Sequence, residues 1–339
     1  MSSLLETKEN LKKFYNRNEA FAAPALKFCL SFLIFLLINI KLGYNDKIDS
    51  VIVVLVAALF CSFMPLKVTA VVAGGFLLLH FYALAPECAL VMGVLLFLMF
   101  LLYLRFVPKE TIVVLITPIL FFLKIPYTIP IAMGLIGGPA SVISVSFGII
   151  ITYLVEYTEM NATTISAMDT ETSITKLRYV VDGILTNKAM LVMLLSFAIT
   201  LLVVYIVRRK SMDHAWMIAI ISGALLNVFV LLVGEFLFEL NYSILGILFG
   251  SVISAFLCRL LQFFTFNIDY SRAENVQFED DEYYYYVKAV PKIAVAAPDK
   301  RVKKINIKRE EMSPEVRGTV KTVKTSHGVS HTSTMRDER

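Results

Sequence analysis

The chain has 339 residues, of which 58% are hydrophobic and 17% are charged, and its formal net charge is +5 at pH 7. Soluble globular domains have roughly 45–50% apolar and about 25% charged residues, so this composition excludes an ordinary soluble protein. The sequence contains no GxxxxGKS/T, GxSxG, HExxH or GxGxxG motif, and its four cysteines and four histidines lack metal-ligand spacing. We therefore expect no enzyme, no metal site and no cofactor.

Residues 1–20 predict an amphipathic helix that lies on the membrane surface. Ser3 and Glu6 have the spacing of a capping box at a helix N-terminus. Leu11 and Phe14 can share an apolar face, while the remaining positions carry cations that suit anionic lipid headgroups, namely Lys8, Lys12, Lys13 and Arg17. The alternative is a polar linker before the first membrane span.

Apolar runs fill most of residues 22–267, and a helix needs about 20 such residues to cross a bilayer. The runs are continuous rather than alternating, which favours helices over the strands of a membrane barrel. The expected fold class is an all-α polytopic membrane protein with about nine or ten transmembrane segments. The expected spans are 22–40, 51–64, 68–82, 88–104, 111–123, 127–137, 139–154, 190–207, 215–238 and 243–266. The second, third, fifth and sixth are too short to cross untilted, and we interpret them as half-helices, hairpins or locally thinned spans.

Two of these stretches read as copies that begin 60 residues apart, at residues 51–75 and 111–135. Each contains the sequence Ile-Val-Val-Leu near its start, a break at a proline and a second apolar run that reaches a glycine. Three segments per copy, 51–104 and 111–154, would insert the second copy upside down, as in transporters built from inverted repeats. The alternative is a chance match between segments rich in Val, Ile and Leu.

Basic clusters orient the protein by the positive-inside rule. Cations near the N-terminus, at 105–109, at 208–210 and at 300–309 all favour the cytoplasmic side. These markers agree when residues 127–154 are split at the Gly-Gly-Pro sequence into two crossings. We therefore predict a bacterial inner-membrane, that is plasma-membrane, protein with both termini in the cytoplasm.

With this orientation, one substantial loop, residues 156–187, lies on the extracytoplasmic side. Its Thr- and Ser-rich residues 161–166 favour irregular chain, and residues 174–185 favour an amphipathic helix. The predicted regions are 1–20, the interfacial helix; 21–155, a membrane region with the repeat; 156–187, the loop; 188–267, a three-helix membrane region; 268–298, an acidic and aromatic β-prone segment; and 299–339, a basic disordered tail.

The segment 268–298 predicts a strand from Tyr283 to Val290, with a hairpin broken at Pro291 as its extension. Aromatic and β-branched density after a run of carboxylates favours β-structure. An isolated hairpin is marginally stable in water, so we expect it to dock on a partner. The candidate partner-binding residues are Glu279, Asp280, Asp281, Glu282, Tyr283, Tyr284, Tyr285 and Tyr286.

Glycine and proline mark a candidate substrate path. At Gly137, Gly138 and Pro139 the helix is interrupted, and backbone groups lose hydrogen bonds that lipid cannot replace. The break must therefore be buried in protein or line a wet cavity. Gly74 and Gly75 are the counterparts in the first copy. The alternative is close helix packing through small residues.

Three polar residues of the ninth span extend this path. Glu235 and Glu239 lie four residues apart on one helix face, and Asn227 lies deeper on about the same face. Charged groups within a span are functional candidates by default, although carboxylates near the outer boundary can simply be hydrated.

Two functions fit these features. The first is a permease or transporter of unknown substrate, with energy supplied by a separate subunit because the chain has no ATP-binding motif. The second is a non-catalytic scaffold for envelope assembly, cell division or sporulation that acts through its cytoplasmic tail. Expected partners are the bilayer, anionic headgroups, a cytoplasmic protein or energy-coupling subunit, and a second copy of the chain; nucleic acid is not expected.

Overall fold

The computed structural model describes residues 2–104, 107–168, 173–240, 242–265, 274–280 and 282–289. The chain divides into two compact units, Met1–Val295 and Ala296–Arg339, and every described residue belongs to the first. The predicted disordered tail at 299–339 lies outside the described residues.

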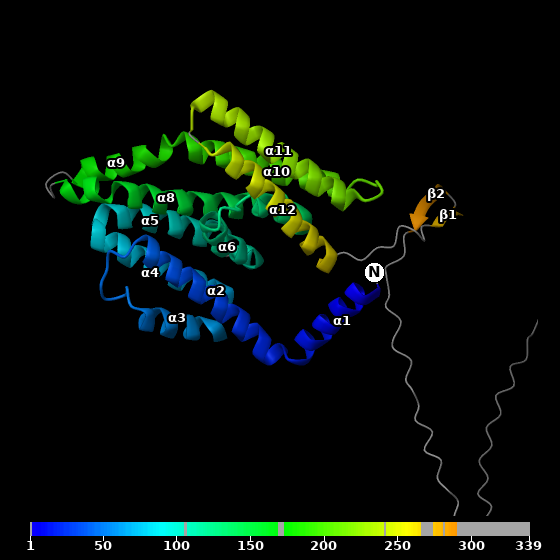
Figure 1. Cartoon of the computed structure of the whole chain (residues 1–339), viewed down its shortest axis with the longest axis horizontal. Helices are drawn as coiled ribbons and strands as arrows, with labels where there is room; N and C mark the ends of the chain where they lie inside the picture. The colour runs from blue at the N-terminus through cyan, green and yellow to red at the C-terminus, as the bar shows by residue number, and fades with distance from the viewer. Residues whose placement is uncertain are drawn as a thin grey trace, which may run out of the picture. The chain divides into compact units, whose positions relative to one another are not determined.

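Helices form most of the described chain (Figure 1). They are α1 (Ser2–Arg17), α2 (Glu19–Lys41), α3 (Val51–Phe63), α4 (Leu66–Leu84), α5 (Pro86–Leu98), α6 (Thr111–Phe122), α7 (Thr128–Ile136), α8 (Ser141–Ala167), α9 (Ser173–Leu185), α10 (Lys188–Arg208), α11 (Ala215–Phe238) and α12 (Ile244–Thr265). A π-helical turn, η1 (Met99–Leu104), extends α5, and a 3-10 turn, η2 (Pro108–Glu110), precedes α6. Among the described residues, six helices are long and apolar enough to cross a membrane: α2, α4, α8, α10, α11 and α12. The protein is a multi-pass membrane protein, as its composition predicts.

Two sequence-based expectations about helix length were wrong. The span expected at 68–82 is the 19-residue helix α4, which is long enough to cross because it extends past both predicted ends. Residues 161–166 were expected to be irregular, yet α8 continues through them to Ala167. Within this stretch the Asn161 side chain donates to the carbonyl oxygen of Tyr157 at 2.8 Å, one turn back, so it does not compete with the helix. The amphipathic helix expected at 174–185 is confirmed as α9.

The first and last helices of the membrane region meet at one end of the bundle, which we call the basal end. Lys8 of α1 donates a hydrogen bond to the carbonyl oxygen of Phe263 near the end of α12. Lys27 Nζ of α2 donates to the carbonyl oxygen of Met64 at 3.1 Å, so α3 ends where α2 begins. Helix α9 lies at the opposite, distal end (Figure 1). The first and the last helix of the membrane region thus meet at the same end of the bundle.

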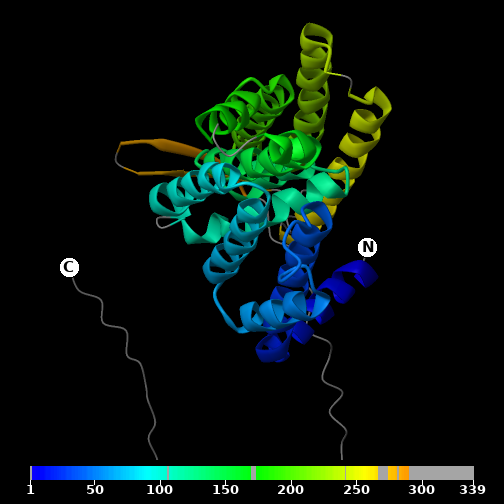
Figure 2. The same ribbon diagram turned by 90° about the vertical axis from the view of Figure 1, so that its left-hand side faces the viewer.

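The C-terminal half packs around α7, the shortest α-helix described. Helices α10, α11 and α12 lie next to one another in this half of the bundle (Figure 2). Ile131 and Leu135 of α7 are fully buried and pack against these three helices. A Cβ atom at Gly134 would lie 2.6 Å from Val204 Cβ, so α10 approaches the α7 backbone directly. Small residues permit such close helix packing in membranes, where water does not drive association.

A two-stranded antiparallel hairpin follows α12, with strands β1 (Glu274–Glu279) and β2 (Tyr284–Ala289). Sequence analysis found β2 but missed β1, because it looked for the partner strand after Pro291, which lies outside the described residues. The turn is held by Asp280, which accepts the backbone N–H of Glu282 at 3.0 Å, the Tyr285 hydroxyl at 2.8 Å and the N–H of Tyr283 at 2.7 Å. These hydrogen bonds lower the pKa of the Asp280 carboxyl group.

Candidate functional site

Helices α6 and α7 form a short hairpin whose two ends meet at the basal end. Glu110, just before α6, accepts the hydroxyl of Ser141 at the start of α8 at 2.6 Å, and the N–H of Gly138, just after α7, contacts the same hydroxyl at 3.3 Å. At about 1.5 Å per residue, α6 and α7 reach only roughly 18 and 14 Å, about half of a bilayer. The hairpin therefore enters the membrane region from the basal end and returns to it.

The predicted break at Gly137, Gly138 and Pro139 is present, between the end of α7 at Ile136 and the start of α8 at Ser141. Its backbone carbonyl oxygens accept hydrogen bonds from an arginine side chain at the end of α10, Arg208. The Arg208 guanidinium donates to the carbonyl oxygens of Leu135 and of Gly137, the latter at 2.6 Å. These acceptors lie at the C-terminus of α7, where the helix dipole favours positive charge.

On the other side of the break, the carboxylate of Glu110 lies at the N-terminus of α8. The two Glu110 oxygens accept the hydroxyls of Ser141 and Ser144, each at 2.6 Å. A carboxylate at this position also suits the positive end of the α8 dipole. Backbone carbonyl oxygens that a helix break exposes must find partners within the protein, and Arg208 supplies a donor for two of them. Glu110 instead binds the two serine hydroxyls at the start of α8.

The tip of the hairpin, residues 123–127, docks on α12. A Cβ atom at Gly250 would lie 2.7 Å from the ring of Tyr127 and 3.1 Å from the carbonyl oxygen of Lys124. One turn further, the hydroxyl of Thr128 donates to Ser254 at 3.0 Å. Lys124 itself has a positive φ of 61°, which a turn between two antiparallel helices accommodates.

The tip forms part of the lining of a cavity with a volume of about 740 Å³. Its walls come from α2, α4, α6, α8 and α12, and they are mainly aliphatic and aromatic. Lining residues that are also exposed mark the mouth: Lys41, Phe122, Lys124, Glu156, Ser243 and Gly246. The mouth thus lies between the distal end of α2 and the start of α12. Ligand cavities in proteins have volumes of about 300–1,000 Å³, which includes this one.

Polar groups cluster at the distal side of this cavity. Lys41 Nζ forms an ion pair with Glu159 at 2.9 Å. The hydroxyls of Tyr153 and Tyr242 lie 3.3 Å apart, and the Tyr242 hydroxyl also donates to a backbone carbonyl oxygen of α10 at 3.1 Å. The backbone N–H of Tyr242 donates to Glu235 at 2.9 Å, which fixes the α11–α12 connection against the cavity wall.

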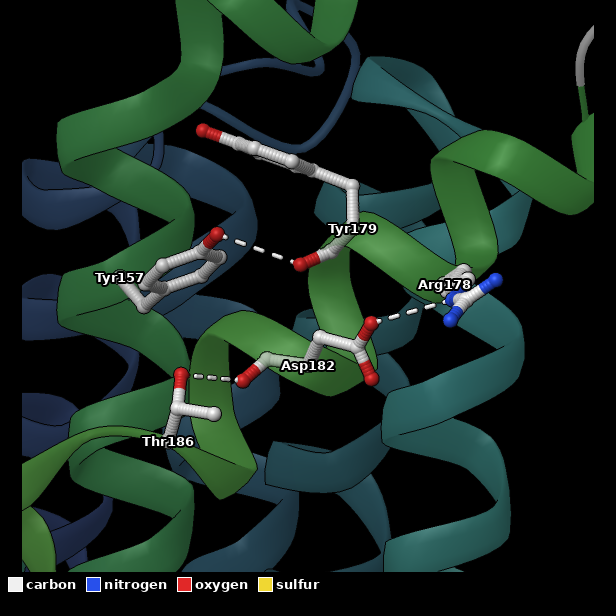
Figure 3. A network of polar contacts seen from close by, with 5 residues as sticks. All are labelled: Tyr157, Arg178, Tyr179, Asp182 and Thr186. Atoms are coloured by element: carbon white, nitrogen blue, oxygen red, sulfur yellow. Dashed lines mark hydrogen bonds and ion pairs between the residues drawn. The ribbon is translucent and has the colours of Figure 1, made fainter.

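Helix α9 braces the turn of α8 that carries the mouth carboxylates (Figure 3). The Tyr157 hydroxyl of α8 donates to the backbone carbonyl oxygen of Tyr179 at 3.3 Å, and Arg178 pairs with Asp182 at 3.3 Å along α9. A Cβ atom at Gly183 would lie 2.0 Å from the Tyr157 hydroxyl, so only glycine allows this approach. Helices α8 and α9 are therefore in close contact at the distal end.

The structure brings one predicted path residue to the cavity and places the others elsewhere. Gly74 lines the cavity, whereas no atom lies within 4 Å of a Cβ built at Gly75. Asn227 is buried and accepts the hydroxyl of Ser196 at 2.7 Å. Glu239 ends α11 in a left-handed conformation with φ of 52°. The Gly-Gly-Pro break is at the basal end, away from the mouth, and the role of these residues in a substrate path stays a prediction.

The two segments of the expected repeat pack differently. In the first segment α4 packs mainly against α5, whereas its counterpart in the second segment, α7, packs mainly against α10. The proline and glycine breaks occur in both, but the inverted relation between residues 51–104 and 111–154 stays a prediction.

Sequence reasoning missed three charged residues of the site: Glu110, Lys124 and Arg208. It treated Arg208 only as an orientation marker and assigned no role to Lys124. A charged side chain beside a break in an apolar span is a functional candidate, and this signal was available for Lys124.

Among the described residues, no group of three or more His, Cys, Asp or Glu side chains is placed to hold a metal ion. Comparison with protein-family models, with curated proteins and with solved structures finds no match in any of the three. Function is therefore inferred from the cavity and the hairpin themselves.

Proposed function

We propose that the protein is a permease whose substrate passes through the cavity above the α6–α7 tip. The observation that supports this most strongly is the cavity of about 740 Å³ within a membrane-spanning bundle, with Lys41, Lys124, Glu156 and Glu159 as the charged residues of its lining. Short helices that end within the membrane and line a cavity are typical of transporter binding sites. Energy would come from a separate subunit.

The distribution of charge favours the basal end as the cytoplasmic side of a bacterial inner membrane. The basal end gathers cations from α1, α2, α4 and α10, namely Lys8, Lys13, Arg17, Lys27, Lys67, Arg208, Arg209 and Lys210. Cytoplasmic loops carry an excess of Lys and Arg. With both termini of the membrane region inside, the cavity opens toward the outer face.

Thiol labelling tests whether the cavity admits water. In a variant without the native cysteines, we expect Thr152→Cys to react with a membrane-impermeant maleimide added to intact cells. Thr152 lines the cavity and is half-buried. The matched control is Val252→Cys on α12, which is 68% exposed on the bundle surface and should face lipid. It should not react, because maleimide needs a hydrated thiolate. An unreactive Thr152→Cys would contradict the permease proposal.

The β1–β2 hairpin supports a scaffold as a second candidate function. Cross-strand pairing places Val276 opposite Val287 and Phe278 opposite Tyr285, which forms one apolar face. The Phe278 and Tyr285 rings stack with centroids 4.9 Å apart, yet both side chains remain more than one-third exposed. An exposed aromatic face on a two-stranded hairpin suits a protein partner.

The scaffold function predicts that the apolar face of the hairpin, and not its other face, captures the partner. We expect the double variant Phe278→Ser with Tyr285→Ser to lose its cytoplasmic partner in pull-downs while membrane insertion is unchanged. The control is Tyr284→Ser with Tyr286→Ser, which removes two aromatic rings that are even more exposed from the opposite face. Identical partners for wild type and both variants would exclude the hairpin as the docking element.

A further inference from the structure

The walls of the cavity are apolar along most of their depth. Ile34 and Ile38 of α2, Leu77 of α4, and Leu115 and Phe121 of α6 all line it. A soluble polar substrate would lose its hydration against these walls without compensation. A hydrocarbon chain would lose nothing, because it already lies in an apolar medium.

Lys124 differs from the other lysine of this lining, Lys41, because it places a cation at the mouth without a counter-ion. Among the described residues, no carboxylate oxygen lies within 4.0 Å of Lys124 Nζ, whereas Lys41 is paired with Glu159. A lysine at this depth in a membrane protein is costly unless it reaches water or binds an anion.

Lys124 lies where its side chain can extend toward the headgroup region of the distal leaflet. Its carbonyl oxygen faces Gly250, which lies six residues, or about 9 Å, inside the start of α12. The polar region of each leaflet is roughly 5–8 Å thick, and a lysine side chain extends toward it along apolar surface. The ammonium group can thus meet a lipid phosphate while the lipid chain lies in the cavity.

We propose that the cavity binds one phospholipid of the distal leaflet, with its chain against α2 and α6 and its phosphate on Lys124. This proposal rests on the proposed function, because it names the substrate class of the same cavity. The mouth between α2 and α12, where Phe122 and Gly246 are exposed, provides entry from the side. A free phosphate compound could share the contact with Lys124 but leaves the apolar walls unoccupied.

Photo-crosslinking in nanodiscs tests this assignment with two probes. One probe is phosphatidylglycerol with a diazirine at the end of one chain, and the other is a diacylglycerol with the same chain and no phosphate. With the full-length protein we expect phosphatidylglycerol to crosslink to cavity-lining peptides of α4 and α6. Lys124→Gln should reduce this crosslinking about tenfold, to the level of the diacylglycerol, because a charge-assisted hydrogen bond is lost. Lys124→Arg should restore it.

Matched controls separate cavity binding from surface contact. Leu37→Trp fills the cavity and should abolish crosslinking by both probes, whereas Leu33→Trp, one turn earlier on the exposed face of α2, should change neither. Lys67→Gln removes a lysine that does not line the cavity and should also have no effect. Each variant is checked for the wild-type melting temperature, and Lys124→Gln remains decisive if Leu37→Trp fails to fold.

Three results would overturn the proposal. Crosslinks confined to exposed helix faces would show ordinary bilayer contact. Crosslinking insensitive to both Lys124→Gln and Leu37→Trp would exclude the cavity. Competition by free glycerol 3-phosphate as strong as the effect of Lys124→Gln would identify a soluble phosphate compound as the ligand. If Thr152→Cys still reacts with the maleimide in any of these cases, the permease proposal stands without the lipid.

Discussion

Arg208→Ala is expected to destabilise the folded protein by at least about 2 kcal/mol, since hydrogen bonds to charged groups contribute about 1.5–3 kcal/mol. Arg208 is the donor for two carbonyl oxygens at the C-terminus of α7, those of Leu135 and Gly137. Alanine would leave both carbonyl oxygens without this charged donor. The melting temperature in mild detergent should fall by on the order of 5 °C.

Arg209→Ala is the matched control for this change. Arg209 is exposed, and its guanidinium contacts the Tyr205 hydroxyl at 2.6 Å on the same helix. Removal of this neighbouring cation changes the net charge by the same amount but affects no carbonyl oxygen of α7. Equal melting temperatures for the two variants would show that Arg208 acts only as a charge at the membrane surface.

Gly137→Ala and Gly138→Ala are expected to differ strongly although the two residues are adjacent. A Cβ atom at Gly137 would lie 2.6 Å from Ser141 Oγ and 2.9 Å from the carbonyl oxygen of Met133. This overpacking should cost about 1–3 kcal/mol and disturb the Glu110–Ser141 contact. No atom lies within 4 Å of a Cβ built at Gly138, so alanine should change the free energy of unfolding by less than about 0.5 kcal/mol.

The same pair separates packing from function. Thermal melts measure the effect of each substitution on packing, and labelling of a cysteine at position 152 measures its effect on access to the cavity. Gly138→Leu, whose Cβ would meet no atom within 4 Å at a half-buried position, should leave the melting temperature near that of the wild type. Unfolding of Gly138→Leu together with an unaffected Gly137→Ala would contradict the described geometry of the break.

The breaks in this fold could be predicted from the sequence because proline and glycine act locally. Met64 precedes Pro65 and is extended, with φ of −92° and ψ of 162°, which ends α3 as the residue before a proline requires. The break after Ile136 follows from Gly137, Gly138 and Pro139 in the same way. Apolar runs of sufficient length likewise predicted α2, α10, α11 and α12.

What holds the breaks could not be predicted, because the partners are distant in the sequence. Arg208 lies 71 residues from Gly137, and Glu110 lies 34 residues from Ser144. The sequence shows that Arg208 and Glu110 are charged. Only the packing of α10 beside α7, however, brings the Arg208 guanidinium to the C-terminus of α7. The depth of Lys124 is equally invisible, because it depends on where the hairpin tip meets Gly250 of α12.

Strand β1 shows a different limit. Its sequence, Glu-Asn-Val-Gln-Phe-Glu, alternates polar and apolar residues, which is a usable strand signal. The tyrosine run of β2 is the stronger strand signal, and its partner strand was expected after Pro291 rather than before the turn. The turn at Asp280 was the overlooked sign, since an aspartate that caps the next backbone N–H groups is typical of tight turns.

Two single cysteines, Lys124→Cys and Ala140→Cys, test most directly whether the α6–α7 hairpin enters from the cytoplasm and carries its tip to an outward-open cavity. Lys124 is exposed at the tip, and Ala140 is exposed beside the break at the basal end. In a background without native cysteines, an impermeant maleimide should modify Lys124→Cys in intact cells and Ala140→Cys only after the membrane is breached. Modification of Ala140→Cys in intact cells, or of Lys124→Cys only after breach, would contradict the account.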